Sequence, residues 1–330
     1  MTALSTSSVV PTTPTAGTTA LRLRGLAKRY PGQPPVDAVA SIDLEVHEGE
    51  LFGLLGPNGA GKSTTVGICT TRIRPTDGSA SVFGLDVVAA PAEVKRVIGV
   101  VTQDNTLDRS LTLEENLFYH GRYFGWSRPA AARRARELLD RFRLADRAHA
   151  FPHQISGGMA QRLQVARAVA HGPRLLFLDE PTAGLDPQSR LALWELVQDL
   201  RGDGLTVVLT THYMEEADQL CERVAIIDHG HVLTVDRPQA LKDAHGSGGI
   251  IDVELERSPA SSVVAALRGL QGVRSVEAGP SDVRVVTDRV DGLLPRIVAA
   301  AAPAGVRDLR VQGSTLEGVF IRLTGRDLRD

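Results

Sequence analysis

The chain has few cysteines, few aromatic residues and no excess of charge of either sign. Its 330 residues include two cysteines, Cys69 and Cys221, which are far apart and form no CxxC pair. This points away from a disulfide framework, and we expect two free thiols that act as small buried hydrophobic groups in a reducing cytosol. The net charge is −2, whereas nucleic-acid-binding domains usually carry a basic stripe. Nucleic acid is therefore not an expected partner.

Long hydrophobic runs are also missing. A membrane-spanning helix needs about 18 or more consecutive apolar residues, and the longest candidates, such as residues 297–302, are far shorter. Residues 2–20 carry no charged side chain and consist mainly of Thr, Ser, Ala and Pro. They lack the basic start and apolar middle of a secretory signal, and we expect residues 1–20 to form a disordered tail. The chain is then expected to stay in the cytosol and to reach a membrane only through a partner.

The composition is otherwise that of a globular protein, with 42% hydrophobic and 23% charged residues. Over residues 21–243, β-type runs alternate with helical patterns, which predicts an α/β domain with a mainly parallel sheet. The clearest buried strands are expected at 51–55, 97–101, 175–178 and 206–210. Ligands of open α/β sheets bind at the carboxyl ends of the strands, so we expect the chemistry at these ends.

A different rhythm follows the glycine-rich stretch 245–249, which predicts a linker. Residues 250–311 have the order β-α-β-β-α-β and a last helix is expected at 315–324. This order predicts a small α+β accessory domain of ferredoxin-like type, without a recognisable catalytic cluster. The expected organisation is a tail at 1–20, a large domain at 21–245 and an accessory domain at 250–330.

The segment Gly56-Pro-Asn-Gly-Ala-Gly-Lys-Ser-Thr64 matches the phosphate-binding pattern G-x-x-x-x-G-K-[ST] and follows an apolar strand. The glycines Gly56, Gly59 and Gly61 allow a tight loop whose N–H groups face an anion, and the helix that follows adds its positive end. A glycine-rich turn without nucleotide is the alternative, against which the Lys-Ser-Thr sequence argues. The residues expected to bind the nucleotide are Gly56, Pro57, Asn58, Gly59, Ala60, Gly61, Lys62, Ser63 and Thr64.

Individual side chains of this loop have distinct expected roles. Lys62 would bring its charge to the β- and γ-phosphates, Ser63 would bind Mg²⁺, and Thr64 would donate to the α-phosphate side. A hydrolytic site of this kind also needs a carboxylate on a neighbouring strand. Two acids follow the apolar run 175–178: Asp179 suits Mg²⁺, directly or through water, and Glu180 is placed to polarise an attacking water. A solvated strand end is the alternative for these acids taken alone.

The segment Ile155-Ser-Gly-Gly-Met-Ala-Gln-Arg162 is similar to the LSGGQ signature of the ATP-binding cassette (ABC) family, and the resemblance covers most of residues 21–245. Ser156, Gly157 and Gly158 open a helical stretch, so they offer a hydroxyl group and a helix N-terminus to a phosphate. The resemblance implies that this surface faces the phosphate loop of a second copy. ATP would then lie between two protomers, which predicts a dimer, most simply a homodimer.

The signature departs from the commonest family pattern in two ways. It begins with Ile155 and carries Met159 where Gln is most frequent, and Ala160-Gln161 replaces the usual basic residues. Met at this position is familiar in cassettes of drug exporters, so activity is expected.

Four further positions match the family and take their roles from the resemblance. Tyr30 matches the aromatic residue that stacks on adenine, and Gln103 matches the glutamine that senses Mg²⁺ and the γ-phosphate. Asp186, in Ala183-Gly-Leu-Asp186, matches the loop that crosses the dimer interface, and His212 matches the switch histidine at the γ-phosphate. Each alone could be an ordinary packing residue. The implied fold is a P-loop NTPase cassette with a parallel-sheet core, an antiparallel β subdomain and a helical subdomain.

Three segments, 116–125, 211–217 and 315–325, resemble one subgroup, the daunorubicin-resistance drug-exporter ATPases and their relatives in nodulation-factor export. Residues 104–126 hold an aromatic cluster, which in the family forms the groove for a coupling helix of the permease. The alternative for these aromatic residues is the core of the helical subdomain.

The resemblance implies an ATP-hydrolysing subunit, with ATP and Mg²⁺, at the cytoplasmic face of the membrane. It would drive export of a drug-like, lipid or natural-product substrate through a separate integral-membrane permease. An ABC ATPase that acts on DNA or ribosomes is the first alternative, but the sequence lacks a long coiled-coil insertion, paired cassettes and basic extensions. A nucleotide-sensing module is the second, and the retention of Asp179, Glu180 and His212 argues against it.

Overall fold

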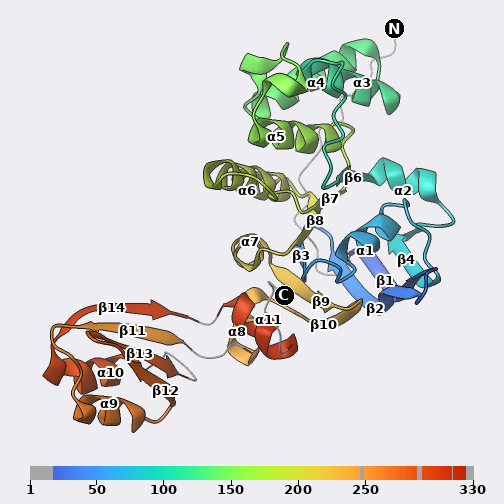
Figure 1. Cartoon of the computed structure of the whole chain (residues 1–330). Helices are drawn as coiled ribbons and strands as arrows, with labels where there is room; N and C mark the ends of the chain where they lie inside the picture. Colours follow the sequence, from blue (N-terminus) through green and yellow to red (C-terminus); the bar gives the residue numbers. More distant parts are fainter. Residues whose placement is uncertain (1–17, 246–248, 288–291, 314, 325–330) are drawn as a thin grey trace. The chain divides into compact units, whose positions relative to one another are not determined.

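The computed structural model describes residues 18–245, 249–287, 292–313 and 315–324 (Figure 1). The chain divides into two compact units, Met1–Val235 and Asp236–Asp330. Most of the tail expected at residues 1–20 lies outside the described residues, and strand β1 begins at Thr19. Helix α8 (Pro238–His245), which the sequence placed at the end of the large domain, is grouped with the second unit.

A six-stranded sheet of order β10-β9-β3-β8-β7-β6 forms the centre of the first unit. Its strands are β3 (Leu51–Leu55), β6 (Ile98–Val101), β7 (Leu175–Asp179), β8 (Thr206–Thr211), β9 (Arg223–Asp228) and β10 (His231–Asp236). The five strands from β9 to β6 in this order pair in parallel. All residues of β3, β7 and β8 are buried, as continuous apolar strands of a parallel sheet should be. The four strands predicted from the sequence are all present.

A second, antiparallel sheet of order β2-β1-β4-β5 lies beside this centre. Its strands are β1 (Thr19–Tyr30), β2 (Val36–His47), β4 (Asp77–Val82) and β5 (Leu85–Asp86). One buried cluster joins the two sheets and includes Leu23 and Val46 from the antiparallel sheet and Phe52 and Phe177 from the parallel one. Helices α1 (Lys62–Cys69) and α2 (Pro91–Val97) connect strands of the two sheets.

The helical part of the first unit contains α3 (Leu113–Tyr123), α4 (Arg128–Arg141) and α5 (Gly157–Ala168), which gather on one side of the unit (Figure 1). Each begins at a hydroxyl side chain that accepts a backbone N–H: Thr112, Ser127 and Ser156. Such caps satisfy amide groups that a helix start leaves unpaired. Helices α6 (Pro187–Gly202) and α7 (Met214–Leu220) follow β7 and β8. Among the described helices, none is long and apolar enough to cross a membrane.

The second unit is built around a four-stranded antiparallel sheet of order β12-β13-β11-β14. Its elements after α8 are β11 (Ile250–Leu255), α9 (Ser261–Arg268), β12 (Val273–Ala278), β13 (Asp282–Thr287), α10 (Leu294–Ala301), β14 (Val306–Gln312) and α11 (Leu316–Thr324). The β-α-β-β-α-β order is the one that the sequence predicts. Val253 and Val285 of the sheet pack with Leu267 of α9 and Ile297 of α10, and α8 packs against α11. The middle of the expected linker, residues 246–248, lies outside the described residues.

Candidate active site

The phosphate loop connects β3 to α1, and its shape depends on glycine. Gly61 immediately precedes α1 and has φ of 102°, a left-handed conformation that other residues adopt only at a cost. A Cβ atom at Gly61 would lie 2.2 Å from the carbonyl oxygen of Ala38. The loop therefore excludes any side chain at this position, directly before the N-terminus of α1 where the sequence predicts a phosphate.

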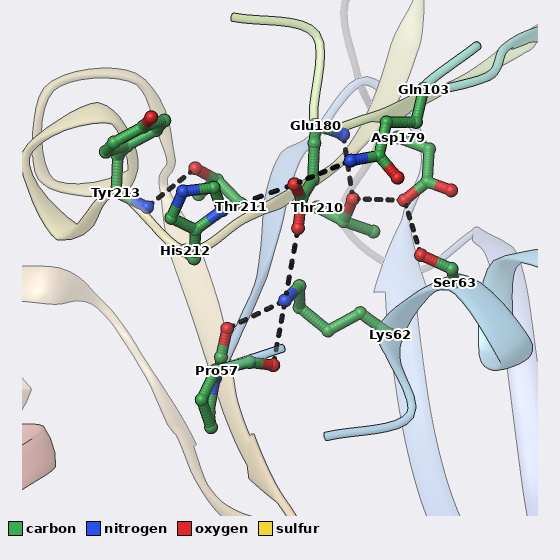
Figure 2. A network of polar contacts seen from close by, with 11 residues as sticks. Pro57, Lys62, Ser63, Gln103, Asp179, Glu180, Thr210, Thr211, His212 and Tyr213 are labelled. Carbon is green, nitrogen blue, oxygen red and sulfur yellow. Dashed lines mark hydrogen bonds and ion pairs between the residues drawn. The ribbon is translucent and has the colours of Figure 1, made fainter. Parts of the chain in front are cut away.

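Lys62, the first residue of α1, is buried within this loop. Its side chain is 4% exposed, and Nζ donates hydrogen bonds to the carbonyl oxygens of Gly56 (2.7 Å) and Pro57 (3.1 Å). Nζ also lies 3.3 Å from Oε1 of Glu180 (Figure 2). Burial lowers the pKa of Lys62, and the charges of Glu180 and Asp179 oppose this shift. The ammonium group is thus held by two carbonyl groups and a carboxylate inside the loop.

Asp179 is the last residue of β7, and its carboxylate accepts hydrogen bonds from two hydroxyl groups. Oδ1 accepts hydrogen bonds from Ser63 Oγ (3.1 Å) and Thr210 Oγ1 (2.6 Å). Asp179 and Thr210 are partners in the parallel register of β7 and β8, so the sheet itself places them side by side. A carboxylate beside a serine hydroxyl group is a pair of hard oxygen ligands of the kind that Mg²⁺ prefers, and these residues fit the predicted ion.

Glu180 follows directly and is the centre of the network in Figure 2. Its φ of 48° is left-handed, which costs a non-glycine residue about 1–3 kcal/mol and is characteristic of functional sites. The backbone N–H donates to Thr210, at Oγ1 (3.0 Å) and at the carbonyl oxygen (3.1 Å). These bonds fix the backbone of Glu180, and with it the base of the side chain, at the carboxyl end of the sheet.

The Glu180 carboxylate meets the two other residues predicted to be catalytic. Oε2 accepts a hydrogen bond from Gln103 Nε2 (3.4 Å). It also lies 3.3 Å from Nδ1 of His212, without the alignment that a hydrogen bond requires. Lys62 begins α1, and the other three residues of this group follow the ends of β6, β7 and β8, so four separate parts of the chain converge on this one point.

The remaining predicted residues lie outside this network and make local contacts. Ser156 caps α5 by accepting the N–H of Met159 (3.3 Å), and Asp186 caps α6 by accepting the N–H of Ser189 (2.9 Å). Hydrogen bonds from Ser189 lower the pKa of Asp186. Tyr30 is half-buried at the end of β1, with Nζ of Lys28 5.1 Å from its ring centroid.

The signature segment and the start of α6 nevertheless touch. A Cβ atom at Gly158 would lie 2.4 Å from Oγ of Ser189, so this glycine permits the close approach of the two helix starts. Gly157 has open space around its Cα, which leaves its backbone accessible.

Sequence reasoning did not identify Thr210 as a site residue, although it stands two residues before His212. A threonine in a buried strand is ordinarily a packing residue, and only the register with β7 gives its hydroxyl group to Asp179.

Comparison with known proteins identifies the architecture. The family described as ABC transporter matches residues 39–183. The daunorubicin/doxorubicin resistance ATP-binding protein DrrA of Streptomyces peucetius is 40% identical over 324 residues, which cover 96% of each chain. The chain belongs to the ABC transporter family.

Other relatives of this ABC ATPase agree with that assignment. The Nod factor export ATP-binding protein I of Cupriavidus pinatubonensis is 39% identical over 316 residues, with 95% of this chain and 93% of the relative covered. A solved dimeric, post-hydrolysis structure of the ATP-binding cassette MJ0796 with ADP and Pi has a TM-score of 0.61 and 30% identity. It covers 66% of this chain and 98% of its own. The predicted cassette fold, the ATP-binding function and the ATPase class are thereby confirmed.

Proposed function

We propose that this ABC ATPase is the motor of an exporter, which binds MgATP between two copies of the chain and hydrolyses it to drive a separate membrane permease. The observation that carries the proposal is the convergence of Lys62, Gln103, Glu180 and His212 at the end of the phosphate loop, next to the Ser63–Asp179 pair. Positioned charges of this kind supply most of the catalysis in phosphoryl transfer.

Each residue has a defined task in this proposal. Lys62 exchanges the carboxylate of Glu180 for the β- and γ-phosphates, which releases Glu180 to polarise the attacking water. His212 and Gln103 orient the γ-phosphate. Ser63, Asp179 and Gln103 would hold Mg²⁺, which neutralises charge that develops on the phosphates. Because Thr210 donates to Asp179 (2.6 Å), it keeps that carboxylate aimed at Ser63.

A second copy of the chain completes the site. Ser156, Gly157, Gly158 and Asp186 lie outside the network around Glu180, yet the exposed Ser156 and Gly157 stand at a helix start suited to phosphate. We assign them to the nucleotide bound by the partner copy, and Tyr30 to the adenine bound by its own copy. The dimeric state of the related MJ0796 cassette supports this arrangement.

The permease, the cargo and the location follow from the relatives. Proteins 37–42% identical to this chain are named for daunorubicin or doxorubicin resistance or for Nod factor export. The corresponding assignment here is antibiotic-resistance-type export of a hydrophobic drug, lipid or natural product, with this chain bound to its permease at the cytoplasmic face of the membrane.

The test is ATP turnover of the purified protein alone and with the permease encoded beside it, in lipid. We expect stimulation by the permease, and for Glu180→Gln a loss of about 10²- to 10⁴-fold in turnover, the usual contribution of a general base. Glu180→Gln should still bind ATP and accumulate as a closed dimer. Glu93→Gln, at an exposed position of α2, is the control. Unchanged turnover in Glu180→Gln would remove Glu180 from catalysis, and hydrolysis that ignores the permease would contradict the transport assignment.

A further inference from the structure

Helix α7 carries a buried carboxylate that has no role in the catalytic mechanism proposed above. Glu216 is 1% exposed, whereas its neighbour Glu215 in the same helix is exposed. Removing a carboxylate from water costs several kcal/mol unless partners compensate for it. The partners of Glu216 therefore indicate what this charge holds together.

These partners come from α6, from the end of β8 and from the turn after β7. Nε1 of Trp194, on α6, donates a hydrogen bond to Oε1 of Glu216 (3.0 Å). Burial raises the pKa of Glu216, and hydrogen bonding from Thr211, Trp194 and Thr182 and the charge of Arg190 oppose this shift. Thr182 and Thr211 are each 1% exposed. Oε2 of Glu216 and Oγ1 of Thr182 are buried without a well-aligned hydrogen bond, so the cluster is under-satisfied on this side.

Two of these partners adjoin the proposed catalytic residues in the chain. Thr182 stands two residues after Glu180, and Thr211 stands immediately before His212. Both threonines are buried and act on the pKa of the same carboxylate, so the position of Glu216 bears on both segments. The carboxylate therefore ties the segment after β7 to the end of β8.

A second path leads from the same cluster to the switch histidine. The guanidinium group of Arg190 lies 4.8 Å from the ring centroid of Tyr213, and the Tyr213 ring centroid lies 4.1 Å from that of His212. The N–H of Tyr213 donates to Oγ1 of Thr211 (2.9 Å). Figure 2 shows residues 211–213 together, with His212 next to Glu180. The stack thus links α6 to the imidazole.

We propose that Glu216 is a positioning residue for ATP hydrolysis, which holds the segment of Glu180 and the segment of His212 in register by anchoring both to α6. It acts through Thr182, Thr211 and the Arg190–Tyr213 stack and touches neither the nucleotide nor the attacking water. This inference rests on the proposed roles of Glu180 and His212. The carboxylate is suited to the task because Oε1 accepts from Trp194 of α6 (3.0 Å) while Oε2 still has acceptor capacity toward the threonine side, which no apolar side chain of similar size offers.

The variants Glu216→Leu, Glu216→Gln and the exposed neighbour Glu215→Gln test the proposal, with kcat and KM for ATP as readouts. We expect Glu216→Leu to lower kcat about 10- to 100-fold, as misplacement of catalytic groups does, with an unchanged KM. Glu216→Gln keeps an acceptor for Trp194 and should lose less, and Glu215→Gln should turn over like the parent protein. Trp194→Phe, which keeps an aromatic ring but removes the donor, is the test variant if Glu216→Leu does not fold.

A double-mutant cycle separates positioning from general destabilisation. Residues that act as one unit are strongly non-additive, so adding Glu216→Gln or Trp194→Phe to His212→Ala should lower kcat by a smaller factor than the same change does in the parent protein. The proposal would be overturned if the two factors multiply in full, if kcat is unchanged in the single Glu216 variants, or if only KM changes. The single variants His212→Ala and Glu180→Gln judge the proposed function independently: if both turn over normally, that function fails whatever Glu216 does.

Discussion

The two units of this chain place charge in opposite ways. In the first unit, Lys62, Asp179 and Glu216 are each less than 9% exposed. In the described part of the second unit, the one buried polar side chain is the hydroxyl-bearing Thr287. The ion pairs of the second unit instead lie at its surface. In one of them, Arg284 (53% exposed) pairs with Asp252 (24% exposed) at 2.8 Å.

The difference separates an interior that serves function from an interior that serves stability. Burying charge costs stability, so we infer that the first unit keeps these buried charges for the proposed catalytic site. A unit whose interior is almost wholly apolar gains stability from packing alone. Perturbing the interior of the first unit should therefore affect ATP binding and turnover, and perturbing the second should affect folding.

The largest stability effect is expected in the core of the second unit. Ile297 of α10 is 0% exposed, and Ile297→Ala should lower the free energy of unfolding by about 2–5 kcal/mol because it leaves a cavity. Denaturant unfolding, with hydrogen exchange of peptides from 250–313, measures this. Val298→Ala, at a 38% exposed neighbour, is the matched control. Equal stability of the two variants would show that this interior is not a packed core, and a loss of ATP affinity in Ile297→Ala would break the comparison.

A somewhat smaller effect, on binding instead of folding, is expected for Lys62→Ala. Charge-assisted hydrogen bonds contribute about 1.5–3 kcal/mol, so affinity for ATP should fall about 10- to 100-fold. Titration calorimetry or a fluorescent nucleotide analogue measures the change, with Lys95→Ala on the exposed face of α2 as the control. An ATP affinity equal to that of the parent protein would remove Lys62 from the phosphate site.

The smallest effect is expected for Arg284→Ala. The guanidinium group pairs with Asp252, which raises the pKa of Arg284, but Arg284 is 53% exposed and ion pairs at the surface contribute little. The unfolding transition of the second unit and the ATPase rate should both equal those of the parent protein within error. A clear loss of stability would mean that surface charge, and not the apolar interior, holds this sheet together.

Much of the fold follows from local pattern. The four continuous apolar runs became β3, β6, β7 and β8, and the alternation after residue 249 became the four-stranded sheet. The boundary between the units was harder, because α8 has helical periodicity that fits either neighbour, and its packing against α11 decides its place. Packing between segments about 75 residues apart has no local signature.

The candidate site likewise has one part that local motifs predict and another part that only tertiary packing brings together. Gly56–Thr64 and the Asp179–Glu180 pair could be found because each motif is contiguous, and its chemistry depends on residues that are neighbours in the chain. Thr210 and Glu216 could not be found, since a buried threonine and a glutamate in a helix are common residues. Their partners, Asp179 and Trp194, stand 31 and 22 residues away.

The sequence by itself determined the phosphate loop, the acid pair, the strands that carry them and the family, because local spacing and periodicity encode these features. Only the tertiary structure decided that Lys62, Gln103 and His212 meet at Glu180 and that a buried carboxylate stands behind them. Both outcomes depend on which strands pair and in which register. Strand pairing is settled by the simultaneous burial of side chains far apart in the chain, which no single segment specifies.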